Sequence, residues 1–350
     1  MFGRKFAEIS CAAMLILATP SLAAAESLRD SLRNAYEHSG LLVQNRALLR
    51  AADEKVADAV AALRPVISWS SQFAHSYSDA AHGDSLTTRL NANWLLYDFG
   101  RSDLQTEALK ESVLATRQSL VSIEQNVLLR AVQAHMNYRR SMEFVSLRSA
   151  NVELIEQELR AAEDRFDVGE VTRTDVALAE ARLASARASL AGAQGDLAKA
   201  AAAYHAVVGR KPDDLVNPSS LPDLPADVSA AIATAWAHHP ELKRVQHDVA
   251  AAELAVKAAQ LAYRPRLEAG AGVSNLDLDG EVSRSLSLTV SGPLYSGGAI
   301  ASASRAAIAQ RDAMRARLHV AGLEAEQTVR NAFVVLEVAR ATGEIGRAHV

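Results

Sequence analysis

Cysteine is almost absent from the sequence. Of its 350 residues one is a cysteine, Cys11, and it lies in a segment that we expect to be removed. Small secreted domains depend on disulfides when their core is small, whereas this chain is long enough not to need cross-links. Cys11 also comes too early, and lacks the neighbours, for a lipid-attachment site. We expect the mature chain to contain no disulfide.

Long apolar runs and a strong charge are missing as well. Beyond the first residues, no stretch reaches the roughly 18 consecutive apolar residues of a membrane-spanning helix, so entry into a membrane would have to use strands. The net charge of −4 argues against a nucleic-acid partner, which favours a basic face. No nucleophile–base pair accompanies a glycine-rich turn, and Gly270 and Gly272 do not open a helix. We expect no enzyme activity, no cofactor and no metal.

The N-terminus has the order of a secretory signal peptide. Arg4 and Lys5 give a positive start, an apolar run extends from Cys11 to Leu17, and Ala23-Ala24-Ala25 offers a cleavage site. The apolar run is too short to span a bilayer as a helix. We therefore expect residues 1–25 to be a signal peptide that is removed after export.

The chain repeats itself at a spacing of about 200 residues. Leu-Arg-Pro at 63–65 corresponds to Tyr-Arg-Pro at 263–265. Each repeat is predicted to consist of a helix, a two-stranded hairpin and a long helix. The first repeat is predicted at 26–208, with strands at about 65–78 and 86–98 and a coiled-coil hairpin at about 100–208. A proline-rich linker, or equatorial region, follows at 209–228. The second, incomplete repeat is predicted at 229–350, with strands at about 265–276 and 282–294.

The predicted strands alternate apolar and polar residues, which is typical of a sheet with one face of each kind. The apolar positions include Trp69, Phe73, Leu90, Trp94, Leu286, Leu288 and Val290. The polar positions include Arg89, Asn91, Asn93, Ser285, Ser287 and Thr289. A half-buried sheet of a soluble domain would show the same alternation, so the pattern alone leaves both open. The signal peptide and the flanking helices favour a membrane barrel. Arg284 interrupts the apolar positions and is tolerable only near a strand end.

The helices are predicted to be long. Residues 101–167 contain neither proline nor glycine, and an unbroken helix there would be about 100 Å long. A compact domain cannot bury such a helix, so it needs a partner beside it. Residues 174–208, in which leucines recur among alanines, provide that partner. Gly169 marks the turn between the two arms.

Four strands are too few to close a membrane barrel. An open edge would expose unpaired backbone groups to lipid, and the smallest membrane barrels have about eight strands. The eight strands of a dimer would be filled by their own side chains. A trimer would supply about 12 strands and a lumen, with the polar positions facing the lumen and the apolar positions facing lipid. We expect a mainly α protein with a transmembrane β-barrel contribution: a trimeric barrel of about 12 strands on an α-helical coiled-coil tube.

Three motifs resemble the TolC family of outer-membrane efflux proteins, over nearly everything after Glu26. The stretch from Phe166 to Val176 is similar to the family's helical-hairpin tip. His-Pro-Glu-Leu at 239–242 resembles the family's Asn-Pro-Glu-Leu, and Leu-Tyr-Asp-Phe-Gly at 96–100 has its partner at 294–298. The resemblance implies a homotrimer in the outer membrane of a Gram-negative bacterium, extending into the periplasm. It would be the passive duct of a tripartite efflux pump or a type I secretion system.

The resemblance also implies partners and site residues. A periplasmic adaptor and an inner-membrane pump or ABC transporter would supply docking and energy, and outer-membrane lipid would surround the barrel. The adaptor would dock on the tip residues Val168, Gly169, Glu170 and Thr172, while Thr174 and Asp175 would help to hold the entrance closed. On the residues alone, a plain hairpin turn at Gly169 without a docking role is an equally good interpretation.

The alternative function is that of a periplasmic adaptor or coiled-coil scaffold of an export system. An adaptor would need one hairpin flanked by lipoyl-like and small barrel domains, and the duplicated plan argues against it. The repeat spacing puts the second return helix beyond Val350, and residues 343–350 break the preceding helical pattern. We therefore expect the second repeat to be incomplete.

Overall fold

A computed structural model describes residues 26–78, 81–218, 223–275 and 282–348. The predicted signal peptide, residues 1–25, lies outside these residues. The chain divides into two compact units: one combines the residues up to Ala35 with Ala131–Ser220, and the other combines Tyr36–Arg130 with Leu221–Val350. The first unit is helical, and the second contains the sheet.

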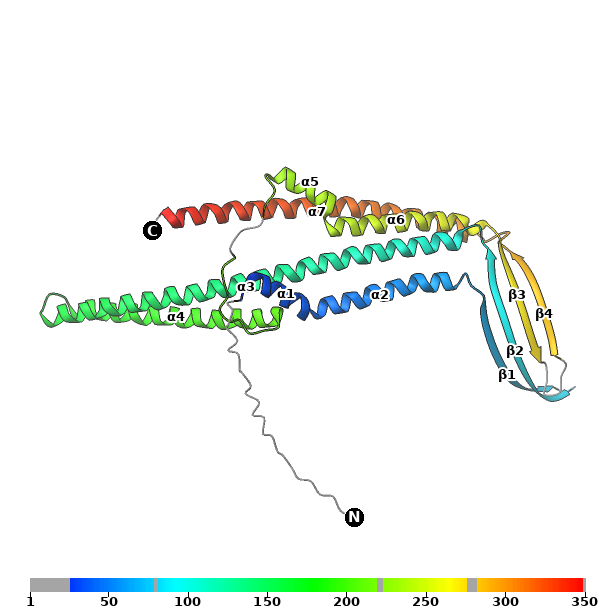
Figure 1. The fold of residues 1–350 in the computed structure, drawn as a ribbon, viewed down its shortest axis with the longest axis horizontal. Coiled ribbons are helices and arrows are strands. Elements are labelled where there is room, and N and C mark those ends of the chain that lie inside the picture. The colour runs from blue at the N-terminus through cyan, green and yellow to red at the C-terminus, as the bar shows by residue number, and fades with distance from the viewer. Residues whose placement is uncertain (1–25, 79–80, 219–222, 276–281, 349–350) are drawn as a thin grey trace, which may run out of the picture. The chain divides into compact units, whose positions relative to one another are not determined.

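The elements follow the same order twice (Figure 1). The first series is α1 (Leu28–His38), α2 (Gly40–Ala61), β1 (Val66–Ser78), β2 (Ala81–Tyr97) and α3 (Arg101–Asp167). After α4 (Arg173–Val208) the second series is α5 (Val228–His238), α6 (Pro240–Gln260), a 3-10 turn (Leu261–Tyr263), β3 (Arg266–Asn275), β4 (Val282–Ser291) and α7 (Ala299–Ala348). The predicted repeat of helix, hairpin and long helix is confirmed, except that two helices stand where one was expected. The break expected in the helical pattern at 343–350 is wrong as far as the described residues extend, because α7 continues to Ala348.

The break in this first helical segment falls at the same place in both repeats. Ser39 has extended backbone, and its hydroxyl accepts a hydrogen bond from the N–H of Leu42 at 3.4 Å. In the second repeat Nδ1 of His239 accepts from the N–H of Glu241 at 3.2 Å, and Pro240 begins α6. Proline lacks the N–H that would continue α5 but is favoured in a first turn. His239, where the sequence departs from the family motif, thus still caps the helix.

The four strands form one antiparallel sheet in the order β1-β2-β3-β4 (Figure 1). Hairpins join β1 to β2 and β3 to β4, and β2 pairs with β3 although α3 to α6 separate them in the sequence. Trp69 lies opposite Leu90, which lies opposite Val273. The register shifts between Leu95 and Tyr97, where β2 approaches α3. The predicted four strands are therefore confirmed.

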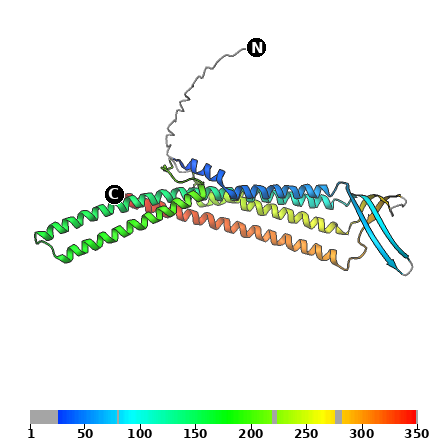
Figure 2. The same cartoon turned by 90° about the horizontal axis from the view of Figure 1, so that it is seen from below.

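In the first unit, α4 runs back along the C-terminal part of α3 (Figure 1, Figure 2). Gly169 forms the turn with a φ of +83°, a left-handed conformation in which a Cβ would be strained. Gly209, with a φ of +82°, ends α4 in the same way. Arg187 of α4 and Glu156 of α3 form an ion pair at 2.8 Å between the two helices. The hairpin is the element that carries the predicted tip.

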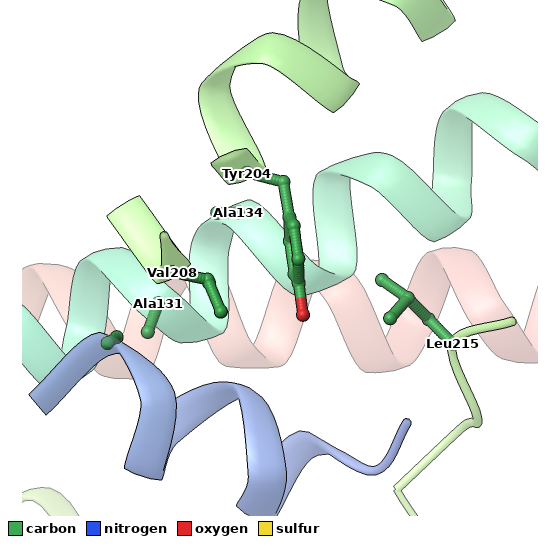
Figure 3. Packing of buried hydrophobic residues seen from close by; sticks show 6 residues of the cluster. Ala131, Ala134, Tyr204, Val208 and Leu215 are labelled. Atoms are coloured by element: carbon green, nitrogen blue, oxygen red, sulfur yellow. The ribbon is translucent and has the colours of Figure 1, made fainter. Parts of the chain in front are cut away.

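Small residues bring the helices of this unit together around Tyr204 (Figure 3). Ala131 and Ala134 of α3 face Tyr204 and Val208 of α4. Tyr204 is the largest of the fully buried side chains. Alanine leaves space for the ring between the backbones, and the cluster is completed by Ala35 of α1 and by Leu215. Burying an apolar side chain such as that of Val208 or Leu215 contributes about 1.5–3 kcal/mol.

The second unit has its own core between α6 and α7. Leu242 and Val245 of α6 are buried against Ala321 and Ala325 of α7. Trp236 of α5 lies over Gly322 of α7 so closely that a Cβ added at Gly322 would overlap the indole ring. Glycine is therefore required at this position by the approach of the ring.

Candidate functional site

One face of the sheet carries the polar positions predicted for a lumen. Strand side chains alternate between faces, and the register sets Asn91 against Gly272 and Ser285, and Asn93 against Gly270. This polar face includes Ser68, Ser70, Arg89, Asn91, Asn93, Arg266, Glu268, Gly270, Gly272, Ser274, Ser283, Ser285, Ser287 and Thr289. All six predicted polar positions are thus brought together.

Glycines of β3 make room on the polar face. A Cβ at Gly270 would lie 2.7 Å from Oγ of Ser287, and a Cβ at Gly272 would lie 2.8 Å from Oγ of Ser285. The hydroxyls of β4 therefore lean over β3 in space that a side chain would fill. This explains in physical terms why glycine alternates with apolar residues along β3.

The opposite, apolar face carries all seven predicted apolar positions: Trp69, Phe73, Leu90, Trp94, Leu286, Leu288 and Val290. Their side chains are exposed, with 75% of Trp69 and 88% of Leu286 accessible. Nε1 of Trp94 donates a hydrogen bond to the carbonyl of Leu63 at 2.9 Å. An exposed apolar surface of this extent indicates contact with lipid or with another protein.

Arg284 is one of the polar residues on the apolar face, together with Ser71, Thr88 and the His75–Asp84 pair. It lies opposite Val273, in the third row from the end of the β3–β4 pairing. A long cationic side chain at such a position reaches out of an apolar layer with its charged end. The register therefore places Arg284 near a strand end, as predicted.

Both edges of the sheet are open among the described residues. β1 and β4 are the outer strands, and no strand of the described chain pairs with their outer sides. Unpaired backbone donors and acceptors on an edge are a template for another strand. In lipid they have to be paired. The sheet therefore has the geometry of an arc that needs further strands.

The predicted tip residues lie together at the turn between α3 and α4. Gly169 N–H donates to the carbonyl of Phe166, and Glu170 N–H donates to that of Arg165, each at 2.9 Å. These bonds satisfy the last carbonyls of α3. Val168 beside them is 72% exposed. An apolar side chain is thus presented at the end of the hairpin.

Asp175 caps the helix that leaves the tip. Its carboxylate accepts hydrogen bonds from the N–H and the hydroxyl of Thr172, at 2.8 and 2.7 Å. These bonds hold the pKa of Asp175 below its ordinary value. Thr174 is exposed in the same turn. The carboxylate that was predicted for the entrance thus has a local structural role in this protomer.

A buried polar cluster was not found from the sequence. Oγ of Ser31 lies 2.9 Å from Nδ1 of His135 and 2.7 Å from the hydroxyl of Tyr204, and all three residues are fully buried. Nε2 of His135 lies 3.1 Å from the carbonyl of Val216. Burial raises the pKa of the Tyr204 hydroxyl. The hydrogen bonds of this buried cluster join α1, α3 and α4.

No local motif could have indicated this cluster. Ser31 and His135 are 104 residues apart, and Ser31 and Tyr204 are 173 residues apart. Among the described residues, no group of three or more His, Cys, Asp or Glu side chains is placed to hold a metal ion. Within the same residues, none of the helices is apolar over a sufficient length to cross a membrane.

Comparison with known proteins decides the family. The family model described as outer membrane efflux protein matches residues 31–210 and 231–350. The chain belongs to the outer membrane efflux protein family. This efflux protein is 34% identical over 346 residues to the outer membrane efflux protein BepC of Brucella suis, and the match covers 96% of this chain and 76% of BepC. The resemblance seen in the sequence is therefore confirmed.

Two further comparisons agree with this family. The efflux protein is 28% identical over 217 residues to the cation efflux system protein CusC of Escherichia coli O157:H7, across 58% of this chain and 46% of CusC. Its fold is that of the Campylobacter jejuni CmeC outer membrane channel, with a TM-score of 0.79 and 16% identity, across 92% of this chain and 73% of the other. The fold is thus that of outer-membrane channels built from a barrel and a helical tube.

The family fixes the class of function and the location. This efflux protein is an outer-membrane channel of efflux systems, located in the outer membrane of a Gram-negative bacterium and extending into the periplasm. Its family consists of channel proteins rather than enzymes. The alternative prediction of a periplasmic adaptor or scaffold is not supported, because the matching family is that of the channels.

Proposed function

We propose that three copies of the efflux protein close one barrel and form a passive conduit with no catalytic activity or cofactor of its own. The observation that carries the proposal is the four-stranded arc with one polar face, one apolar face and two open edges. β1 of one copy would pair with β4 of the next, which satisfies every edge. Three arcs of four strands give about 12, enough for a lumen.

In the closed barrel, the polar face lines the lumen and the apolar face contacts outer-membrane lipid. The residues are those predicted: Arg89, Asn91, Asn93, Ser285, Ser287 and Thr289 inside, and Trp69, Phe73, Leu90, Trp94, Leu286, Leu288 and Val290 outside. Each protomer would contribute two repeats, at 26–208 and 229–350, joined by an equatorial linker at 209–228. The exposed apolar face supports the lipid assignment, since it would otherwise need a partner protein.

The conduit would also meet a periplasmic adaptor that connects it to an inner-membrane pump or ABC transporter. Val168, Gly169, Glu170 and Thr172 would form the docking surface, and Thr174 and Asp175 would contribute to the entrance gate. The exposed Val168 at a glycine turn supports docking. An apolar side chain at the end of a hairpin is better explained by a partner than by a core.

Single cysteines test the two faces directly. The only native cysteine is Cys11, so a Cys11→Ser background leaves no thiol. Ser287→Cys and Leu286→Cys are neighbours on opposite faces of β4. In outer membranes, a charged, membrane-impermeant maleimide should label Ser287→Cys through the aqueous lumen, whereas Leu286→Cys should be protected by lipid. Equal labelling of both, or labelling of Leu286→Cys alone, would contradict the conduit.

A further inference from the structure

The polar face is neutral over most of its length, with one exception. Its side chains are mainly serine, threonine, asparagine and the hydrogen of glycine. At the end of the sheet nearest the helices, Arg266 and Glu268 compensate each other in an ion pair at 3.1 Å. Among the described residues of this face, Arg89 is the one charged side chain outside that pair.

Within the described strands, the residues next to Arg89 carry no negative charge that would neutralise it. The register places Ser70 on one side of Arg89 and Ser274 on the other, and Ser283 lies beyond Ser274. These hydroxyls carry no charge. Arginine cannot lose its proton at any physiological pH. Its positive charge is therefore permanent.

Acidic residues of the described sheet are too far away or face the other way. Glu268 lies opposite Leu95, which is six residues along β2 from Arg89, or about 20 Å at 3.3 Å per residue. That distance exceeds the Debye length of about 8 Å at physiological ionic strength. Asp84 belongs to the opposite face and is paired with His75 at 2.5 Å.

We propose that Arg89 makes the barrel selective for anions. The inference rests on the proposed trimer, because cyclic symmetry would bring three copies of Arg89 to one level of the lumen. A ring of arginines in a narrow pore raises the local concentration of anions and repels cations. The solutes that this ring favours are small organic anions that carry carboxylate, phosphate or sulfonate groups.

Arg284 provides a matched control. It lies opposite Val273, in the row next to the Arg89–Ser274 row, but on the apolar face. The two arginines thus have the same charge and nearly the same height in the sheet. They differ in the face from which the side chain projects, so a neutral substitution at each isolates the contribution of the polar face.

The test is ion selectivity of the purified protein in planar lipid bilayers under a KCl gradient. The wild type should prefer chloride. Arg89→Gln should lower the chloride-to-potassium permeability ratio about threefold, which corresponds to the loss of about half a kT of potential in the lumen, because the potential acts on chloride and potassium in opposite directions. Arg89→Lys should retain the ratio, and Arg284→Gln should leave it unchanged. The difference should vanish near 1 M salt, where the Debye length is about 3 Å.

Two outcomes overturn the inference while the conduit stands: conducting Arg89→Gln channels with the wild-type ratio, or an equal change in Arg284→Gln. If the wild type and a variant with a weakened entrance gate, Asp175→Asn, both insert in the bilayer but do not conduct, the proposed conduit fails and the selectivity fails with it.

Discussion

Phe99 and Gly100 enter α3 with left-handed backbone conformations, at φ values of 60° and 79°. At the matching place before α7, Gly297 and Gly298 have φ values of 58° and 86°. The repeated feature is therefore the turn itself, which glycine adopts freely and Phe99 adopts under strain. The ring of Phe99 gains contacts in return, with its centroid 4.8 Å from that of Tyr97 and 5.6 Å from the guanidinium carbon of Arg264.

Gly322 gives a residue-scale prediction about stability. Gly322→Ala should destabilise the second unit by about 1–3 kcal/mol, because its Cβ would overlap Trp236. Gly195→Ala is the control, since nothing lies near the added Cβ in α4, and it should stabilise its helix by up to about 1 kcal/mol. Urea unfolding in detergent measures both. A Gly322→Ala protein as stable as Gly195→Ala would show that the indole does not pack there.

Asp175 gives a prediction about pH. A carboxylate whose pKa is lowered in the folded state stabilises that state above the unfolded pKa, about 4, and loses this contribution as the pH falls through the lowered value. Hydrogen–deuterium exchange over residues 168–178, corrected for intrinsic rates, should show that the protection of the wild type falls below about pH 4. Asp175→Asn should exchange faster at neutral pH, whereas Asp164→Asn should match the wild type. Equal protection in all three would rule out the cap.

At the element scale, the alternation of apolar and polar residues along the strands determines which side chains share a face of the sheet. The two-residue repeat of the strand sequences predicted a polar and an apolar face. The register confirms that the polar positions share one face and the apolar positions the other. The absence of proline and glycine in 101–167 likewise predicted α3, which spans 67 residues. Such features are local, so a single sequence reveals them.

Features that depend on distant partners were not predictable. The Ser31–His135–Tyr204 cluster joins residues from three helices, and none of the three lies in a motif. The place of Trp236 over Gly322 required the packing of α5 on α7. The pairing of β2 with β3 was likewise not fixed by the alternation, which is the same for every order of strands.

The faces of β4 give an element-scale prediction. Leu286→Arg should reduce insertion of the barrel, because a charge on the lipid face near the bilayer centre costs about 2–4 kcal/mol. Ser287→Arg should insert normally and change the conductance of the lumen instead. The amount of heat-resistant oligomer in the outer membrane measures insertion for both. Equal defects would refute the assigned faces.

At the scale of the whole molecule, the account requires partners: further copies for the sheet edges and an adaptor for the tip. The β1 and β4 edges are unpaired among the described residues, and Val168 is exposed at the turn. Neither feature is satisfied within one protomer. An assembly that pairs the edge strands and covers the tip would explain both the open edges and the exposed Val168.

The tip gives a prediction about export. Gly169→Val should reduce export, because a β-branched residue is strained at a φ of +83° and would distort the turn that presents Val168. Oligomer level and membrane insertion should stay normal, since the sheet is untouched. Gly195→Val, in the body of α4, is the control for a general helix defect. If Gly169→Val exports its cargo at the wild-type rate, the docking assignment is wrong.

The central claim is that three arcs of four strands close one barrel, and cryo-electron microscopy of the protein in lipid nanodiscs tests it most directly. The account predicts three copies around a threefold axis, with β1 of each copy hydrogen-bonded to β4 of the next. It also predicts Arg89 and Ser287 on the inside and Leu286 against lipid. A particle with any other number of copies, or one in which the β1 and β4 edges remain unpaired, would contradict it.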